Sequence, residues 1–217
     1  IKPGETIAFV GATGSGKSTI ISLITRLYDI QKGEILIDGI ELKKYQLKEL
    51  RRKIAVVLQD VFLFTGDIGS NIRLNNEELT DDQVYMAIKI ACADNFVDSL
   101  PRGIKSEVKE RGCTFSSGQR QLLSFARAVA LNPAVLILDE ATAYIDTETE
   151  EMIQRSMENV ISGRTSILIA HRLSTIRKAN RIYVIDKGRI MEEGDHETLM
   201  SLNGLYKNFV ELSLKNS

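Results

Sequence analysis

A glycine-rich stretch near the start of the chain has the residue types and spacing of a phosphate-binding loop. It consists of Gly11, Ala12, Thr13, Gly14, Ser15, Gly16, Lys17, Ser18 and Thr19, which fit the pattern G-x-x-x-x-G-K-[ST]. Glycines permit positive φ angles, so backbone N–H groups can curve around phosphate oxygens. We expect Lys17 to reach the β- and γ-phosphates of a nucleoside triphosphate and the Ser18 hydroxyl to bind Mg²⁺. The alternative is a glycine-rich turn that leads into an ordinary helix.

Two carboxylates, Asp139 and Glu140, follow the apolar run Val135 to Leu138. In P-loop enzymes an Asp at such a strand end holds Mg²⁺, usually through water. A neighbouring Glu can orient or deprotonate the attacking water. We therefore predict that Asp139 holds the metal and that Glu140 is catalytic, against the alternative of a solvated acidic pair.

Two further polar residues, Gln59 and His171, also follow apolar runs directly. Ligands of α/β sheets bind at strand ends, so the Gln59 amide oxygen is a plausible Mg²⁺ contact, although alone it is weak evidence. A strand-end histidine can donate to a γ-phosphate, but it is as often structural. The two residues by themselves leave both interpretations open.

A second helix start lies far along the chain and consists of Phe115, Ser116, Ser117, Gly118 and Gln119. Ser116 and Gln119 stand at capping-box spacing, and an apolar-periodic segment follows them. The N–H groups of this helix start make a second anion site. One nucleotide needs only one such cradle, so the second one requires an explanation.

The elements that position these residues follow from the hydrophobic pattern. Continuous apolar runs typical of strands buried on both faces occur at Ile7–Val10, Ile35–Ile37, Ile54–Leu58, Val135–Leu138, Ile167–Ala170 and Ile182–Ile185. Helix-period segments separate most of them, which indicates an α/β fold with a mainly parallel sheet. The middle of the chain, from about Asp67 to about Asn132, contains no convincing strand.

Three shorter segments complete this outline. Thr80 to Gln83 has the form of a capping box and begins a helix in the middle of the chain, so we predict a helical insertion there. Gly33 to Gly39 is typical of a turn, a strand and a turn on a small antiparallel sheet. From His196 onward we expect one or two short helices and a polar tail.

Composition excludes several classes of protein. The 217 residues carry a net charge of −1, so we expect no nucleic-acid partner, which would need a concentrated basic face. Two cysteines argue against a disulfide framework and suit a reducing compartment. No apolar run approaches the roughly 20 residues that span a bilayer. The chain begins at Ile1 and is interpreted as a fragment of a longer protein.

With these motifs in this order, the chain resembles the nucleotide-binding domain of an ATP-binding cassette (ABC) transporter, of the exporter type with membrane helices fused ahead of it. The resemblance covers essentially all 217 residues. Its motifs are the Walker A loop at Gly11–Thr19, the Q-loop glutamine Gln59, the X-loop at Ser106–Gly112, the signature at Phe115–Gln119, Walker B with its catalytic glutamate at Val135–Glu140, the D-loop at Ala143–Asp146 and the switch histidine His171.

The resemblance implies a P-loop NTPase (RecA-like) core with a mainly parallel sheet, a small antiparallel β subdomain shortened at its N-terminus, and an inserted α-helical subdomain. One domain would span residues 1–217, with the core at about 1–66 and 133–217 and the helical subdomain with the signature at about 67–132. It also implies ATP and Mg²⁺ as cofactors. The implied catalytic residues are Glu140, His171 and Lys17, and the implied metal ligands are Ser18, Gln59 and Asp139.

The resemblance also accounts for the second anion site. Two such domains are expected to pack head to tail, with each ATP between the Walker A loop of one and the signature of the other, and the Asp146 D-loop belongs to the same arrangement. The expected partners are a second nucleotide-binding domain and the transporter's transmembrane domain. The implied location is the cytoplasmic face of the cell membrane, with the isolated domain soluble.

Three positions depart from the family pattern. Ser117 stands where the signature has its first glycine, and Tyr144 and Ile145 occupy the D-loop where Ala-Leu is frequent. An aromatic that stacks on adenine, about two dozen residues before Walker A, would lie outside this chain, because only ten residues precede Gly11. An altered signature with an intact Glu140 occurs in one subunit of heterodimeric exporters, and a homodimer that tolerates Ser117 is the alternative.

Two other functions fit parts of the pattern. A nucleotide-gated module would close a dimer with ATP but hydrolyse little, and Glu140 and His171 argue against it. A soluble ABC enzyme of DNA repair or translation would need long insertions, zinc-type cysteines or a basic face, which this sequence does not have. The favoured function is Mg²⁺-dependent ATP hydrolysis that powers a membrane exporter.

Overall fold

The computed structural model describes residues 1–74, 76–139, 147–169 and 173–215, and the chain divides into two compact units. Unit 1 comprises Ile1–Val56, Ala134–Ala141 and Thr165–Ser217. Unit 2 comprises Val57–Pro133 and Thr142–Arg164. The helical insertion predicted at about 67–132 falls within unit 2, which also contains the helix of residues 147–161.

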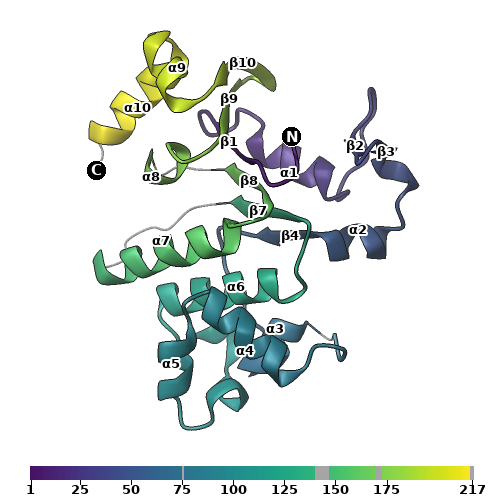
Figure 1. Ribbon diagram of the computed structural model, residues 1–217, viewed down its shortest axis with the longest axis vertical. Coiled ribbons are helices and arrows are strands. Elements are labelled where there is room, and N and C mark those ends of the chain that lie inside the picture. Colours follow the sequence, from purple (N-terminus) through teal and green to yellow (C-terminus); the bar gives the residue numbers. More distant parts are fainter. Residues whose placement is uncertain (75, 140–146, 170–172, 216–217) are drawn as a thin grey trace. The chain divides into compact units, whose positions relative to one another are not determined.

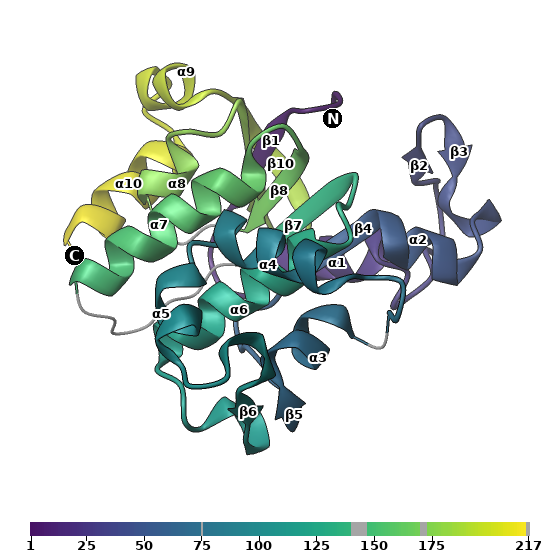
Figure 2. The same cartoon turned by 60° about the horizontal axis from the view of Figure 1, so that its bottom comes forward.

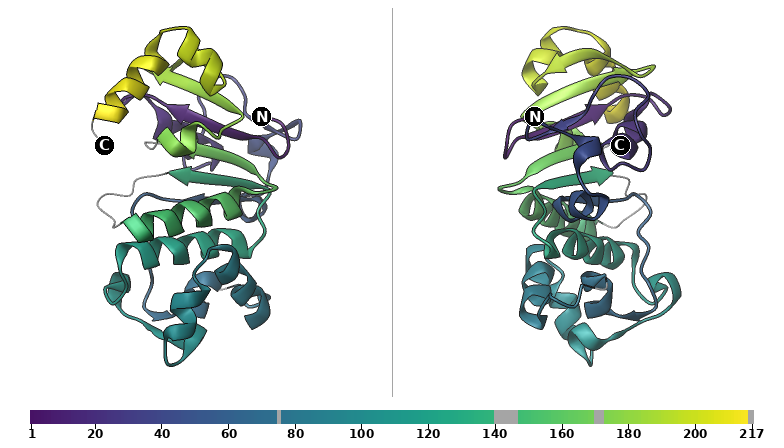
Figure 3. Two further views of the ribbon diagram at one scale, coloured as in Figure 1. Left: turned by 60° about the vertical axis from the view of Figure 1, so that its left-hand side comes forward. Right: turned by 90° about the vertical axis from the view of Figure 1, so that its right-hand side faces the viewer.

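Unit 1 is built on a six-stranded sheet with the order β10-β9-β1-β8-β7-β4 (Figure 1). Its strands are β1 (Thr6–Val10), β4 (Ile54–Val57), β7 (Val135–Asp139), β8 (Thr165–Ile169), β9 (Arg181–Asp186) and β10 (Arg189–Gly194). β1 pairs in parallel with both β8 and β9, β7 pairs in parallel with β8, and β10 pairs antiparallel with β9. Figure 3 shows β1, in purple, between its two green neighbours.

The apolar runs form these strands because residues on both of their faces are buried. Ile7 and Phe9 belong to a core cluster with Ile21 of α1 (Lys17–Ile24) and Leu50 of α2 (Leu47–Lys53). The alternating residues of β1, such as Val10, are fully buried as well. The prediction of a mainly parallel sheet with two covered faces is therefore confirmed, and all six predicted runs contain strands.

The remaining elements of unit 1 are short. A two-stranded antiparallel sheet joins β2 (Leu36–Ile37) and β3 (Ile40–Glu41), as predicted for the segment Gly33 to Gly39. A 3₁₀ turn, η1 (Leu42–Lys44), follows β3. The C-terminal part contains α8 (Leu173–Ile176), α9 (His196–Ser201) and α10 (Leu205–Lys215). The prediction of one or two short helices from His196 onward is therefore confirmed, and α9 and α10 are both present.

Unit 2 is mainly helical (Figure 2). Its helices are α3 (Ile68–Arg73), α4 (Asp81–Ile90), α5 (Asp94–Ser99), α6 (Ser117–Ala130) and α7 (Thr147–Ile161), with 3₁₀ turns η2 (Gly103–Lys105) and η3 (Glu110–Gly112). α4 begins with the predicted capping box, in which Gln83 N–H donates to the Thr80 hydroxyl over 3.3 Å. α6 packs against α3, α4 and α7.

Two parts of the strand pattern differ from the prediction. In the middle of the chain, β5 (Gly66–Asp67) pairs with β6 (Glu107–Val108), so the prediction of a middle without strands is wrong at these positions. A pair of two-residue strands has no period that a sequence pattern can display. β10 is also absent from the predicted runs, because four of its six residues are Arg, Glu and Gly and it runs along the edge of the sheet. In the described part of the chain, no helix combines the length and apolarity that a bilayer crossing requires.

Candidate nucleotide site

The predicted phosphate-binding loop lies in unit 1, between β1 and α1, at the carboxyl end of a central strand. Gly11, Gly14 and Gly16 have φ angles of 150°, 79° and 109°, values that residues with a Cβ rarely adopt. Ser15 N–H donates to the Ala12 carbonyl over 3.1 Å, which closes the turn. The glycines therefore supply the positive φ angles that this curved loop requires.

The Lys17 side chain lies inside the loop rather than in solvent. Its Nζ donates to the carbonyl oxygens of Gly11 and Ala12 over 2.7 and 2.9 Å, and only 6% of the residue is exposed. Burial lowers the pKa of Lys17, and the negative charge of Asp139 at the end of β7 opposes that effect. A positive charge is thus held at the centre of a ring of backbone groups.

The first turn of α1 is suited to an anion. Gly16 is its N-cap residue and, among the described residues, no side chain caps the helix there. The first N–H groups of an α-helix have no intrahelical acceptor, and the helix dipole adds about half a positive charge at this end. Ser18 and Thr19 in this turn are exposed. These groups fit a phosphate, and the Ser18 hydroxyl and the half-buried Asp139 are oxygen donors of the kind that Mg²⁺ prefers.

The loop is supported by a part of the sheet that the sequence did not point to. The Gly188 N–H, in the turn between β9 and β10, donates to the Ser15 carbonyl over 2.8 Å. A Cβ on Gly11 would stand 2.2 Å from the Ile185 carbonyl oxygen at the end of β9. No local signal in the sequence identifies these contacts, because about 170 residues separate the partners.

We predict that Gly11→Ala destabilises the chain by about 1–3 kcal/mol, since its new methyl group meets a backbone oxygen that cannot rotate away. Gly14→Ala is the matched control, because Gly14 also has a positive φ but a Cβ there meets nothing within 4 Å. Urea unfolding of both variants measures the difference. Equal losses of stability would show that the contact with Ile185 does not matter.

The segment predicted to be the signature motif lies in unit 2, at the start of α6. Ser116 N–H donates to the Gln119 side-chain oxygen over 3.0 Å, and Gln119 N–H donates to the Ser116 hydroxyl over 3.2 Å, so the predicted capping box is confirmed. Phe115 is buried, and its ring packs edge-on against that of Phe96, with the ring centroids 6.1 Å apart. The motif is thus a fixed helix start with an exposed Ser116.

The two central residues of the motif differ in how much space they have. Ser117 is exposed, whereas Gly118 is buried and a Cβ on it would stand 2.2 Å from Cγ2 of Thr149 in α7. Only the second of the two positions therefore requires glycine for packing. The serine that departs from the family pattern stands at the permissive position.

The other predicted site residues have less support. Gln59 is exposed and belongs to unit 2, after the end of β4. Glu140, Asp146 and His171 lie outside the described residues. In the part of the chain that is described, no three acidic, histidine or cysteine side chains gather into a ready metal site. The roles predicted for these residues remain predictions.

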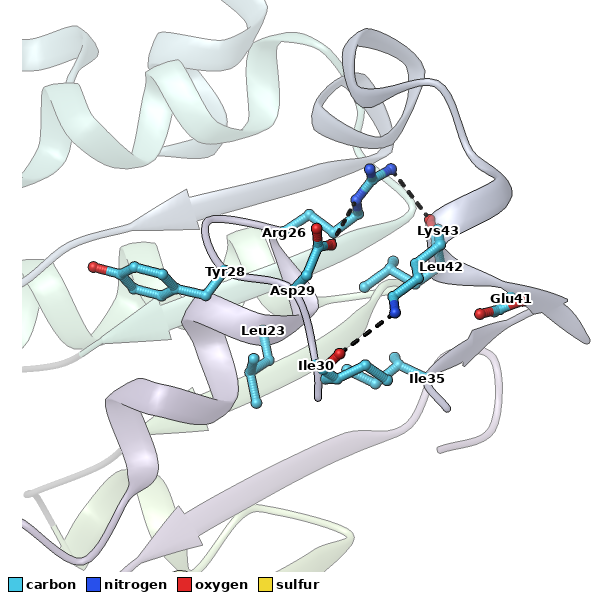
Figure 4. A pocket seen from close by; sticks show the side chains of 9 residues that line it. All are labelled: Leu23, Arg26, Tyr28, Asp29, Ile30, Ile35, Glu41, Leu42 and Lys43. Carbon is cyan, nitrogen blue, oxygen red and sulfur yellow. Dashed lines mark hydrogen bonds and ion pairs between the residues drawn. The ribbon is translucent and has the colours of Figure 1, made fainter. Parts of the chain in front are cut away.

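A hollow elsewhere in unit 1 is too small to be the site. It is lined by residues of α1, β3, η1 and the segment between α1 and β3, and Figure 4 shows side-chain contacts among them. Arg26 pairs with Asp29 over 3.7 Å, and Lys43 donates to the Ile30 carbonyl over 3.4 Å. Its volume of about 10 Å³ is that of a single water. The candidate site is therefore the exposed loop and helix start, not this hollow.

Strand, glycine-rich loop and helix, with a carboxylate at the end of a nearby parallel strand, define a P-loop nucleotide-binding domain. Residues 1–143 match the model of the ABC transporter family, and the chain belongs to that family. The family predicted from the motifs is therefore confirmed.

Known proteins of this family resemble the chain over nearly its whole length. It is 54% identical over 96% of its residues to a probable multidrug resistance ABC transporter ATP-binding/permease protein of Bacillus subtilis. It is 50% identical over 98% of its residues to an ATP-dependent lipid A-core flippase of Pseudoalteromonas atlantica. It spans 31% and 36% of those two proteins, about a third of their length.

A solved structure gives the same result for the fold. The structure of a bacterial Atm1-family ABC exporter with ATP bound matches 97% of the chain with a TM-score of 0.89 and 41% sequence identity. The chain covers 37% of that protein. The predicted fold class, a P-loop core with a mainly parallel sheet, is thereby confirmed.

Proposed function

We propose that the chain binds and hydrolyses ATP with Mg²⁺ and that this reaction powers export by a membrane transporter. The observation that carries the proposal is the buried Lys17 ammonium, held 2.7 Å from the Gly11 carbonyl in a loop that opens onto an uncapped helix start. Such a charge in such a loop fits the polyphosphate of a nucleotide. The similar exporter with ATP bound, at 41% identity, supports the choice of ATP.

Each predicted residue has a definite task in this proposal. Bound Mg²⁺-ATP would supply the transferable γ-phosphoryl group and a metal that screens its charge. Lys17 and the N–H groups of the loop hold the phosphates, and Ser18, Gln59 and Asp139 hold the metal. Glu140 accepts a proton from the attacking water, and His171 donates to the terminal phosphate.

In this proposal, the signature helix of this chain binds the ATP that a second copy or a related subunit holds. The N–H groups of Ser117 and Gly118, in the first turn of α6, have no intrahelical acceptor, so this helix start can take an anion. In a head-to-tail pair, with Asp146 at the contact, they would bind the ATP held by the partner's Walker A loop. The relatives named as ATP-binding/permease proteins support a transmembrane partner, which is fused to this domain in them. This placement puts the domain on the cytoplasmic side of a membrane.

The test is an ATPase assay of the chain with Mg²⁺ and with excess EDTA. We expect hydrolysis only with Mg²⁺, because the metal that Ser18, Gln59 and Asp139 would hold would supply the charge that screens the phosphates. Lys17→Ala should weaken ATP binding about tenfold or more, since a hydrogen bond to a charged group contributes roughly 1.5–3 kcal/mol. Lys32→Ala, an exposed lysine of the same unit, is the control.

Two results would contradict the proposal. Hydrolysis that is equal with EDTA would exclude the metal, and unchanged ATP affinity in Lys17→Ala would exclude the loop as the phosphate site. ATP binding with negligible hydrolysis would instead favour the nucleotide-gated module.

A further inference from the structure

The loop that carries Gln59 is held to the signature helix by two side chains whose functions the motifs do not assign. Gln59 begins the segment that runs to β5, and Asn71 and Arg127 bind the backbone of that segment from α3 and α6. All of these residues belong to unit 2. The contacts therefore lie within one compact unit.

Asn71 pairs with the loop in the manner of a neighbouring strand. Its side-chain oxygen accepts from Phe64 N–H over 2.8 Å, and its amide nitrogen donates to the Phe64 carbonyl over 2.8 Å and to the Asp67 carbonyl over 3.0 Å. Only 3% of Asn71 is exposed. A buried amide that makes these bonds resists replacement, because a lost partner leaves a desolvated polar group.

Arg127 holds the same network from the signature helix. Its Nη1 donates to the Phe62 carbonyl over 2.8 Å, its Nε to the Asn71 carbonyl over 2.9 Å, and its Nη2 to the Asn71 side-chain oxygen over 2.9 Å. Its guanidinium also lies 5.8 Å from the centre of the Phe64 ring. Burial lowers the pKa of Arg127, because the guanidinium charge is partly desolvated among these groups.

The geometry requires arginine rather than any cation. Three acceptors in different directions match the planar fork of a guanidinium, whereas an ammonium on a flexible stem cannot bind all three in place. The Phe62 carbonyl is three residues along the chain from Gln59. While Arg127 holds this carbonyl, the Gln59 Cα stays within roughly 11 Å of it. Arg127 lies on the helix whose N-terminus is the signature motif.

We infer that Arg127 is a positioning residue, which fixes the Gln59 loop to the signature helix so that the metal ligand and the signature are carried as one body. The inference rests on the proposed function, in which Gln59 binds Mg²⁺. Leu63, fully buried beside Gly112, and the β5–β6 pair also anchor this segment. The loss of Arg127 should therefore displace the loop without unfolding unit 2.

Arg127→Lys tests the inference, because it retains the charge and removes the fork. We expect it to raise the Mg²⁺ concentration for half-maximal hydrolysis about tenfold, as substitutions behind a metal ligand commonly do, with KM for ATP unchanged at saturating Mg²⁺. Hydrogen exchange should show faster exchange of the Phe64 amide, whose acceptor Asn71 loses its support. Arg73→Lys is the matched control: Arg73 binds the Leu79 carbonyl and Asp81, away from the loop.

A second variant keeps the test valid if Arg127→Lys fails to fold. Asn71→Asp removes both donors to the loop while leaving acceptors for Arg127, and it should raise the Mg²⁺ requirement in the same direction. Unchanged Mg²⁺ dependence in a folded variant, or an equal effect of Arg73→Lys, would overturn the inference while the parent's ATPase activity stands. A parent chain without Mg²⁺-dependent hydrolysis would refute the proposed function, and the inference with it.

Discussion

Replacing Glu140 by Gln should lower ATP turnover on the order of 10²-fold or more and leave ATP binding close to the parental value. The amide has nearly the shape of the carboxylate but cannot accept a proton from the attacking water. The loss should therefore affect kcat and spare the equilibrium affinity, because in the proposed function the Walker A loop holds the phosphates and Glu140 acts on the water. A single-turnover assay together with an equilibrium binding measurement separates the two effects.

Glu148→Gln is the matched control for this prediction. Glu148 is an exposed carboxylate in the first turn of α7, where it complements the helix dipole. We expect its replacement to leave turnover within about twofold of the parent, because a helix-dipole charge contributes only roughly 0.3–1 kcal/mol to stability. Hydrolysis at the parental rate in Glu140→Gln would exclude Glu140 as the general base and would indicate that another group activates the water.

Adding one methyl group to the signature at Gly118 should disrupt the packing of α6 against α7. The Cβ of Gly118→Ala would stand 2.2 Å from Thr149 Cγ2. Two non-bonded carbons cannot approach so closely, so one of the two residues must shift. Overpacking of this kind lowers the free energy of unfolding by about 1–3 kcal/mol. The better helix propensity of alanine offsets up to about 1 kcal/mol of this loss. We expect a net loss of stability, together with weaker ATP-driven pairing because the signature helix start is displaced.

A double-mutant cycle with Thr149→Ser isolates this contact. Serine removes Cγ2 but retains the hydroxyl, and the next atom, Thr149 Cβ, is at an ordinary 3.6 Å from the position of the added methyl group. Gly118→Ala should therefore cost less stability in the Thr149→Ser background, with a coupling of about 0.5–3 kcal/mol. Ser117→Gly serves as the exposed control. Additive effects in urea unfolding would show that the two residues do not interact.

The local features of the site followed from the sequence because each depends on neighbouring residues. A loop with Lys17 at its centre, the capping box of Ser116 and the strands on either side are written in short patterns of glycine, serine and apolar residues. The family followed as well, because several such patterns occur in a fixed order. These are the features that local propensity and periodicity can specify.

The contacts between distant segments did not follow from the sequence. Gly118 of α6 faces Thr149 of α7, and Arg127 binds the Phe62 carbonyl, 65 residues away in the sequence. Neither contact has a spacing that a pattern could reveal, since both depend on how α6 packs within unit 2. The edge strand β10 escapes prediction for a related reason: its charged residues are stabilised by pairing with β9 and not by their own β propensity.

Ser117 bears on whether the proposed pair of domains is made of identical chains. Its exposed position at the first turn of α6 allows a side chain there without a clash inside the unit. We propose that a pair of identical chains tolerates this serine. The alternative is a non-identical partner subunit, whose own signature would serve the Walker site of this chain.

The most direct test of the account is the mass of the Glu140→Gln chain by light scattering, with and without Mg²⁺-ATP. Slow hydrolysis should trap the ATP-bound form, so we expect the mass to double when ATP is added and to return to that of a monomer when ATP is removed. We expect such doubling because the Walker A loop of one chain and the signature of another would act on the same nucleotide. A chain that binds ATP and stays monomeric at every concentration would contradict the pairing of identical domains.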